Sequence, residues 1–181
     1  PHSHSAAISI LMSSLLRGVT VRIQSEKEPA DIIAATKSFK PQLMVAFPKT
    51  FTDLCRLELN PDDFASLSYW ISTGDANHEP HIRKLISLGN CVIKGQPTKG
   101  SIFIDNLGSS EFGFAMFRNI HTPFSNDYKR SIGKPFSWVQ CEILDQQGKP
   151  AASNTVGYLG VKSESVTAGY WNNHLLTEKN R

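Results

Sequence analysis

The chain has 181 residues, 40% of them hydrophobic and 19% charged, with a formal net charge of +3, which allows a core for one or two domains. The positive charge is weak and dispersed, so we expect no nucleic-acid partner. No stretch approaches the ~20 apolar residues of a membrane helix, so we expect no membrane span.

Helices and strands alternate in the first part of the chain. Arg17-Gly18 is a helix-stop signal, and Pro29 can open a helix. The apolar run at residues 43–47 is typical of a strand buried on both faces. The predicted elements are a helix at 8–16, a strand at 19–23, a helix from 29 to the residue before 41, a strand at 43–47, a helix at 50–57, a strand at 67–72, a helix at 78–88 and a strand at 101–104. This alternation predicts an α/β fold with a mostly parallel sheet and flanking helices.

The pattern changes near Ile132. Short strands are predicted at 139–144 and 157–161, with a turn at 148–150 between them. We therefore expect an α/β subdomain at 1–131 and a small antiparallel β-barrel-like subdomain at 132–181, truncated at its C-terminal end. The chain has no initiator Met and ends inside an unfinished segment, so we interpret it as a fragment of a larger protein.

Three cysteines, Cys55, Cys91 and Cys141, are far apart and form no Cys-x-x-Cys pair. Their odd number and spacing favour buried free thiols over disulfides or zinc. No basic segment precedes the apolar start of the chain, so a signal peptide is not expected. Together these features predict a cytoplasmic protein.

The segment from Asp105 to Glu111 follows an apolar strand and predicts a ligand-binding turn. Ligands of parallel sheets bind just past the carboxyl ends of the strands. Gly108 permits close backbone approach, Ser110 can donate to a phosphate oxygen, and Glu111 offers a hard oxygen to Mg²⁺. A structural turn remains the competing interpretation of this motif taken alone.

Two other motifs compete with this interpretation. Gly108 to Gly113 is similar to a Gly-x-Ser-x-Gly nucleophile elbow, one residue too long, and Asp127 and His174 could complete a serine hydrolase triad. His78-Glu79-Pro80-His81 is one residue short of a zinc-binding His-Glu-x-x-His motif, and a helix start is the favoured interpretation.

Segments along nearly the whole chain resemble the adenylate-forming enzymes, the acyl-CoA synthetases and adenylation domains. The segments are Pro1-His2-Ser3-His4, Leu15 to Val21, Ala46 to Thr50, Leu67 to Ala76, Asn106 to Glu111, Ile132 to Pro135, Val156 to Leu159 and Gly169 to Asn172. Their common order is more specific than any one of them.

The resemblance implies a role for each matched residue. Gly74, Asp75, Ala76, Asn106, Leu107, Gly108 and Ser109 are expected to bind the nucleotide. Ser110 and Glu111 are expected to be catalytic, with Glu111 the metal ligand. The acid would lie against His4, Phe47, Trp70 and Phe112. The implied cofactors are ATP and Mg²⁺, with CoA or phosphopantetheine as the thiol acceptor; the implied partners are a small-molecule carboxylic acid and an acyl or peptidyl carrier protein.

The chain departs from the family pattern at three positions. Leu107 replaces the aromatic residue that stacks on adenine, Tyr158 stands where Glu is usual, and Thr73 stands where Gly is usual. The family's phosphate loop would lie upstream of the chain, and its ribose-binding Asp and catalytic Lys downstream. We therefore expect an acid–thiol ligase whose isolated fragment is inactive, with a non-catalytic binding or scaffold homologue as the alternative.

Overall fold

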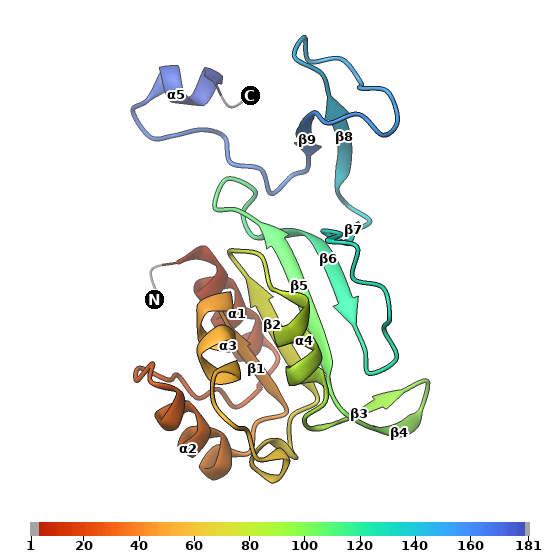
Figure 1. The fold of residues 1–181 in the computed structure, drawn as a ribbon. Helices are drawn as coiled ribbons and strands as arrows, with labels where there is room; N and C mark the ends of the chain where they lie inside the picture. The colour runs from red at the N-terminus through yellow and green to blue at the C-terminus, as the bar shows by residue number, and fades with distance from the viewer. Residues whose placement is uncertain (1–3, 180–181) are drawn as a thin grey trace.

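The computed structural model describes residues 4–179. Its elements in chain order are α1 (Ser5–Leu16), α2 (Pro29–Phe39), β1 (Leu43–Ala46), α3 (Pro48–Cys55), the 3-10 helix η1 (Pro61–Phe64), β2 (Tyr69–Thr73), α4 (Glu79–Ile86), β3 (Asn90–Ile93), β4 (Gln96–Lys99), β5 (Ile102–Gly108), β6 (Ala115–His121), β7 (Lys134–Pro135), β8 (Gln140–Leu144), β9 (Tyr158–Lys162) and α5 (His174–Lys179) (Figure 1). Within this described part, every helix is too short or too polar to cross a membrane.

Five strands form one mixed sheet in the order β1-β2-β5-β6-β7. The pairs β1–β2 and β2–β5 are parallel, whereas β6 and β7 run antiparallel to their neighbours. The carboxyl ends of β1, β2 and β5 therefore meet at one edge of the sheet (Figure 1). The predicted α/β class is confirmed, but the mostly parallel sheet is corrected to a mixed one, because β5 turns directly back into β6.

The main core lies between this sheet and helices α3 and α4. Phe51 and Leu54 of α3 and Leu85 of α4 pack with Trp70 of β2 and Phe103 of β5, and all five side chains are fully buried or nearly so. Burial of such side chains is the main favourable contribution to folding. Both α3 and α4 have a proline in their first turn, where the backbone N–H that proline lacks would have no partner within the helix.

The later part of the chain adds two small antiparallel pairs. β3 and β4 form one hairpin, and β8 pairs with β9. A second apolar cluster joins Met116 and Phe117 of β6 to Val139, with Leu159 and Val161 of β9 packed against it. Within residues 4–179 the predicted barrel-like part is thus a two-stranded sheet rather than a barrel.

Two predicted strands differ from the observed ones. Residues 19–23 form no strand, and Val19 and Ile23 are exposed, because alternation gives a strand only where a neighbouring strand supplies hydrogen bonds. β1 lies at the sheet edge and is only half-buried, so the prediction that it is buried on both faces is wrong.

Cys141 is exposed rather than buried as predicted, and all three cysteines are free.

Candidate functional site

The register of β2 and β5 places the candidate nucleotide-binding residues side by side. Ser72 pairs with Asp105 and Thr73 with Asn106, so the loop at 74–76 leaves β2 next to the end of β5. The strand prediction is corrected here, because β5 continues to Gly108 instead of ending at residue 104. Asp105, Asn106 and Leu107 are therefore strand residues, held by β2 on one side and β6 on the other.

A β-bulge shifts the pairing of β5 with β6 between Leu107 and Gly108, at the end of the strand. A Cβ at Gly108 would lie 2.0 Å from the carbonyl oxygen of Phe114, so only glycine fits there. The bulge re-aims the chain into the loop at 109–114, as bulges near functional sites often do. Leu107 keeps 36% of its surface exposed at this edge.

The loop after β5 contains both serines of the predicted site. The Ser109 hydroxyl accepts a hydrogen bond from the Phe112 amide over 3.3 Å, and the Gly113 amide donates to the Ser110 carbonyl over 3.1 Å. The Ser110 hydroxyl lies 3.4 Å from that of Ser5 in the first turn of α1. The chain thus brings the start of α1 to the predicted phosphate-binding serine.

Glu111 is held by a segment far away in sequence. Its Oε1 accepts a hydrogen bond from the Tyr170 hydroxyl over 2.8 Å, and its backbone carbonyl accepts one from the Thr167 amide over 2.7 Å. The Tyr170 hydrogen bond, supported by a backbone hydrogen bond and by Ser109, holds the pKa of Glu111 below its ordinary value. Glu111 is therefore ionised at neutral pH. Its contact with Tyr170 could not be predicted from the sequence around either residue.

A single ionised carboxylate fits the metal that the family pattern implies. Mg²⁺ usually binds one or two protein carboxylates together with substrate phosphates. Glu111 meets this requirement, and one phenol proton occupies only one of the acceptor positions of its carboxylate. Across residues 4–179 no three His, Cys, Asp or Glu side chains converge, so a metal here would depend on phosphate oxygens for further ligands.

Three of the residues predicted around the acid and nucleotide are in contact. His4 is the N-cap of α1, where its Nδ1 accepts from the Ala6 amide over 3.2 Å, and its ring meets that of Phe47 edge-on at 5.1 Å. A Cβ at Gly74 would lie 2.9 Å from the Phe47 ring, so this ring packs on the loop after β2. Pro1–Ser3, the rest of the first family segment, lie outside the described residues.

Of two other predicted acid-binding residues, Trp70 is buried in the core and Phe112 is partly buried. Trp70 has no exposed surface, and its Nε1 donates to the Ser101 hydroxyl over 2.7 Å. In this structure the Trp70 side chain supports the fold, and its role in binding the acid stays a prediction. Phe112 packs against the second apolar cluster of Met116, Phe117 and Val139.

The loop after β2 is fixed by polar contacts. The Ala76 amide donates to the Asp75 carboxylate over 2.7 Å, and the Asn77 side chain donates to Asp105 over 2.9 Å. Burial raises the pKa of Asp105 to about 6, although the hydrogen bond from Asn77 opposes this shift. Sequence reasoning missed Asn77, whose pairing depends on the register of β2 and β5.

The raised pKa of Asp105 predicts a pH-dependent stability. The folded state binds this proton more tightly than the unfolded chain, whose aspartates titrate near 3.9, so the stabilisation is present at low pH and is lost as the pH rises through about 6. Between pH 5 and pH 8 we expect the wild type to lose about 1 kcal/mol of unfolding free energy relative to Asp105→Asn. Urea unfolding of both proteins at the two pH values checks this, and parallel pH profiles would contradict it.

The two competing motifs gain no support from the geometry. In the described structure the hydroxyls of Ser109 and Ser110 are engaged by Phe112 and Ser5, and the Asp127 carboxylate pairs with Lys129 at 2.9 Å instead of with a histidine. His78 is the N-cap of α4, as predicted for a helix start, and Glu79 pairs with Arg83 at 2.7 Å.

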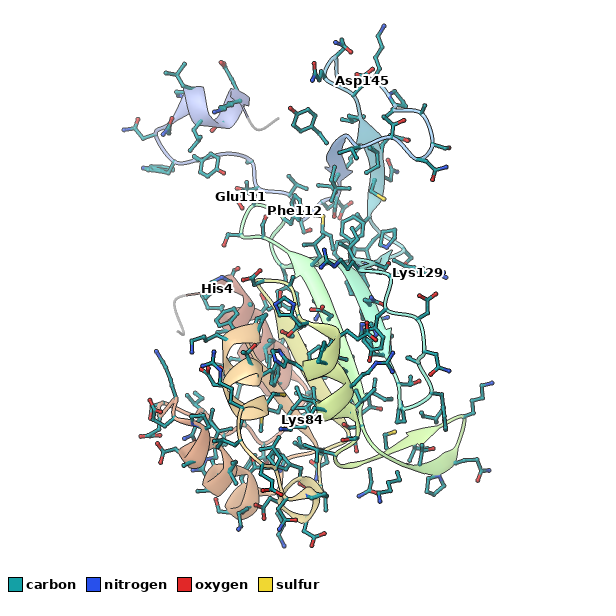
Figure 2. The ribbon with its side chains drawn as sticks, in the orientation of Figure 1. His4, Lys84, Glu111, Phe112, Lys129 and Asp145 are labelled. Atoms are coloured by element: carbon teal, nitrogen blue, oxygen red, sulfur yellow. The ribbon has the colours of Figure 1, made fainter. Side chains whose placement is uncertain are left out.

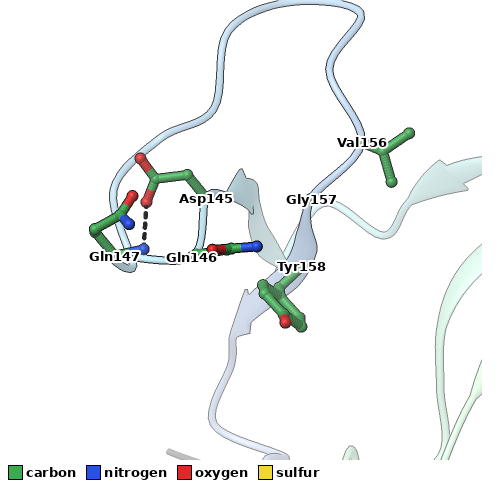
Figure 3. Close-up of a pocket in the computed structure, with 6 residues that line it drawn as sticks. All are labelled: Asp145, Gln146, Gln147, Val156, Gly157 and Tyr158. Atoms are coloured by element: carbon green, nitrogen blue, oxygen red, sulfur yellow. Dashed lines mark hydrogen bonds between the residues drawn. The ribbon is translucent and has the colours of Figure 1, made fainter.

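Two pockets lie near the sheet and its extension. One of about 240 Å³ is lined by Asn77, His78, Glu79, Pro80, Ile82, Asp105, Asn119, His121, Tyr128, Arg130 and Ser131. The other, of about 460 Å³, is lined by the turn at 145–147 and by Val156, Gly157 and Tyr158 (Figure 3). Figure 2 places Asp145 at the far end of the β8–β9 pair from Glu111, so this second pocket is separate from the candidate site.

Comparison with known proteins identifies the family and the fold. A family model described as AMP-binding enzyme matches residues 1–171. A curated protein of Streptomyces, 3-aminoavenalumate diazotase, is 36% identical over 186 residues, covering 100% of this chain and 33% of that protein. The chain therefore spans about a third of the length of this relative.

Solved structures with 19% identity share the fold. A benzoate CoA ligase from Burkholderia xenovorans LB400 matches with a TM-score of 0.81, covering 97% of this chain and 34% of that one. The o-succinylbenzoate CoA synthetase of Bacillus subtilis matches with a TM-score of 0.78 over 100% of this chain, and it has been solved with its acyl-adenylate and with ATP and magnesium.

Proposed function

The chain belongs to the AMP-binding enzyme family, and from this premise we propose that it supplies part of the active site of an ATP-dependent ligase that activates a carboxylic acid. The observation that carries the proposal is that β2 and β5 end at the same sheet edge, so the loop at 74–76 and the segment with Ser110 and the ionised Glu111 both leave the sheet there. Segments present in the relatives and absent from this chain would complete the site. We also propose that the protein acts in the cytoplasm.

The proposed reaction has two steps. A carboxylate oxygen attacks the α-phosphorus of ATP, the bond to pyrophosphate breaks, and an acyl-adenylate forms. The thiol of CoA, or of a phosphopantetheine on a carrier protein, then attacks the acyl carbon and AMP leaves. Stabilising the charge that develops on phosphate oxygens is the main task of such a site.

Different residues of this chain would bind the nucleotide, its phosphates, the metal and the acid. The backbone at 74–76 and residues Asn106–Ser109 would hold the nucleotide, and Leu107 would give it an apolar contact. Ser110 would donate a hydrogen bond to a phosphate oxygen, and Glu111 would hold Mg²⁺, which neutralises phosphate charge when bound. His4 and Phe47 would face the acid.

Pyrophosphate exchange by the full-length protein, with a panel of aryl and alkyl carboxylic acids, tests the proposal. Exchange that depends on one class of acid would support adenylate formation and identify the substrate class. A folded protein that exchanges pyrophosphate with no acid would contradict it. Adding CoA or a phosphopantetheine-loaded carrier protein then distinguishes the two thiol acceptors.

The identity with a diazotase favours a second candidate function. At 36% this relative is more similar than the solved CoA ligases at 19%, and its name denotes formation of a diazo group on an amino-substituted substrate. Nitrite is a common nitrogen donor in diazotisation, and its oxygen can attack the α-phosphorus of ATP as a carboxylate does. Nitrite-dependent pyrophosphate release in the same assay, with no response to acids, would favour this function.

Leu107 motivates a non-catalytic alternative. An aromatic ring at this position would stack on a base, whereas the partly exposed leucine offers only an apolar contact. The leucine therefore loses the stacking contribution to nucleotide binding, which is about 1 kcal/mol. Titration of the full-length protein with ATP distinguishes the alternatives, because a scaffold homologue would bind no nucleotide.

A further inference from the structure

The loop that contains Glu111 is tied to the segment 165–170, which connects β9 to α5. Three hydrogen bonds join them: Tyr170 to the Glu111 carboxylate, Thr167 to the Glu111 carbonyl over 2.7 Å, and the Ser165 hydroxyl to the Phe112 carbonyl over 2.8 Å. Figure 2 shows Glu111 where the loop meets the chain that runs to α5. The side chain predicted to bind the metal is thus held from outside its own loop.

Tyr170 is itself fixed by local structure. Its amide donates to the Thr177 hydroxyl over 2.9 Å, and that hydroxyl donates to the Asn173 carbonyl over 2.9 Å. Gly169 has a φ of +147°, and a Cβ there would lie 2.6 Å from the Thr177 side chain. Glycine therefore lets the chain approach Thr177 closely enough to aim the tyrosine at Glu111.

On this basis, and resting on the proposed function, we propose that Tyr170 is a positioning residue for the magnesium carboxylate. Its hydrogen bond to Oε1 fixes the direction of the Glu111 side chain and leaves acceptor capacity on the carboxylate for a cation. Groups that orient a metal ligand in this way tune metal affinity without touching the metal. The same contact links the segment 165–170 to the nucleotide site.

The test compares Tyr170→Phe with Tyr158→Phe in the full-length protein. Both variants lose one phenol hydroxyl, but Tyr158 is 68% exposed and lies on β9 away from Glu111. Isothermal titration calorimetry measures ATP binding with Mg²⁺ and with EDTA. We expect Tyr170→Phe to weaken binding of Mg²⁺-loaded ATP roughly 3- to 10-fold more than binding of metal-free ATP, as the loss of a partly exposed hydrogen bond to a charged group implies. Tyr158→Phe should change neither.

Equal weakening with and without Mg²⁺, or none, would overturn the inference, because a merely structural role would not depend on the metal. Absence of Mg²⁺-dependent ATP binding in the wild type would overturn it as well. Pyrophosphate exchange on the same proteins separates the two proposals. If the wild type exchanges pyrophosphate and Tyr170→Phe keeps the wild-type Mg²⁺ dependence, only the inference fails. If none of the acids supports pyrophosphate exchange by the wild type, the proposed function is contradicted.

Discussion

Replacing Glu111 by Gln is expected to reduce substrate-dependent pyrophosphate exchange by roughly 100-fold or more, which is the usual scale for losing one electrostatic contact to a transition state. The substitution keeps the size of the side chain and removes its negative charge. Tyr170 can still donate to the amide oxygen of the new side chain, so the loop should keep its place. The measurement is the exchange rate at saturating substrate and varied Mg²⁺.

Glu164→Gln provides the matched control. Glu164 is exposed in the turn after β9, and the substitution removes the same charge there. It should leave the exchange rate unchanged. An equal loss in both variants would point to a general effect of charge, and full activity of Glu111→Gln would remove Glu111 from the proposed metal site.

Replacing Trp70 by Ala is expected to lower the free energy of unfolding by about 3–5 kcal/mol, the range for large aromatic truncations in a core. The indole ring meets Phe51 edge-on at 5.7 Å and lies 5.8 Å from Phe64, and all three side chains are buried. Its loss leaves a cavity and removes a hydrogen bond to Ser101. Urea unfolding at neutral pH measures the change.

Two further variants make this prediction specific. Trp171→Ala removes a tryptophan that is 98% exposed and should change the unfolding free energy by less than about 0.5 kcal/mol. Trp70→Phe keeps most of the apolar volume and remains measurable if the alanine variant does not fold. Similar losses for Trp70→Ala and Trp171→Ala would contradict the placement of Trp70 in the core.

Local signals in the sequence determined most of the element order. Arg17-Gly18 ends α1, Pro29 begins α2, and the alternation of helices and strands gives the α/β class. The family pattern around Asn106 to Glu111 lies on a segment that ends at the same sheet edge as β2, which is where ligands of parallel strands bind. Such features depend on neighbours in the chain, where backbone preferences and side-chain spacing act directly.

Tertiary structure alone decided the features that depend on distant partners. Residues 19–23 have strand-like alternation but no strand, whereas β5 extends to Gly108 because β2 and β6 supply its hydrogen bonds. The burial of Trp70 follows from the packing of α3 and η1 against β2. The contact of Tyr170 with Glu111 joins residues 59 apart in sequence. Pairing and burial are set by which surfaces meet in space, and a one-dimensional pattern does not contain that information.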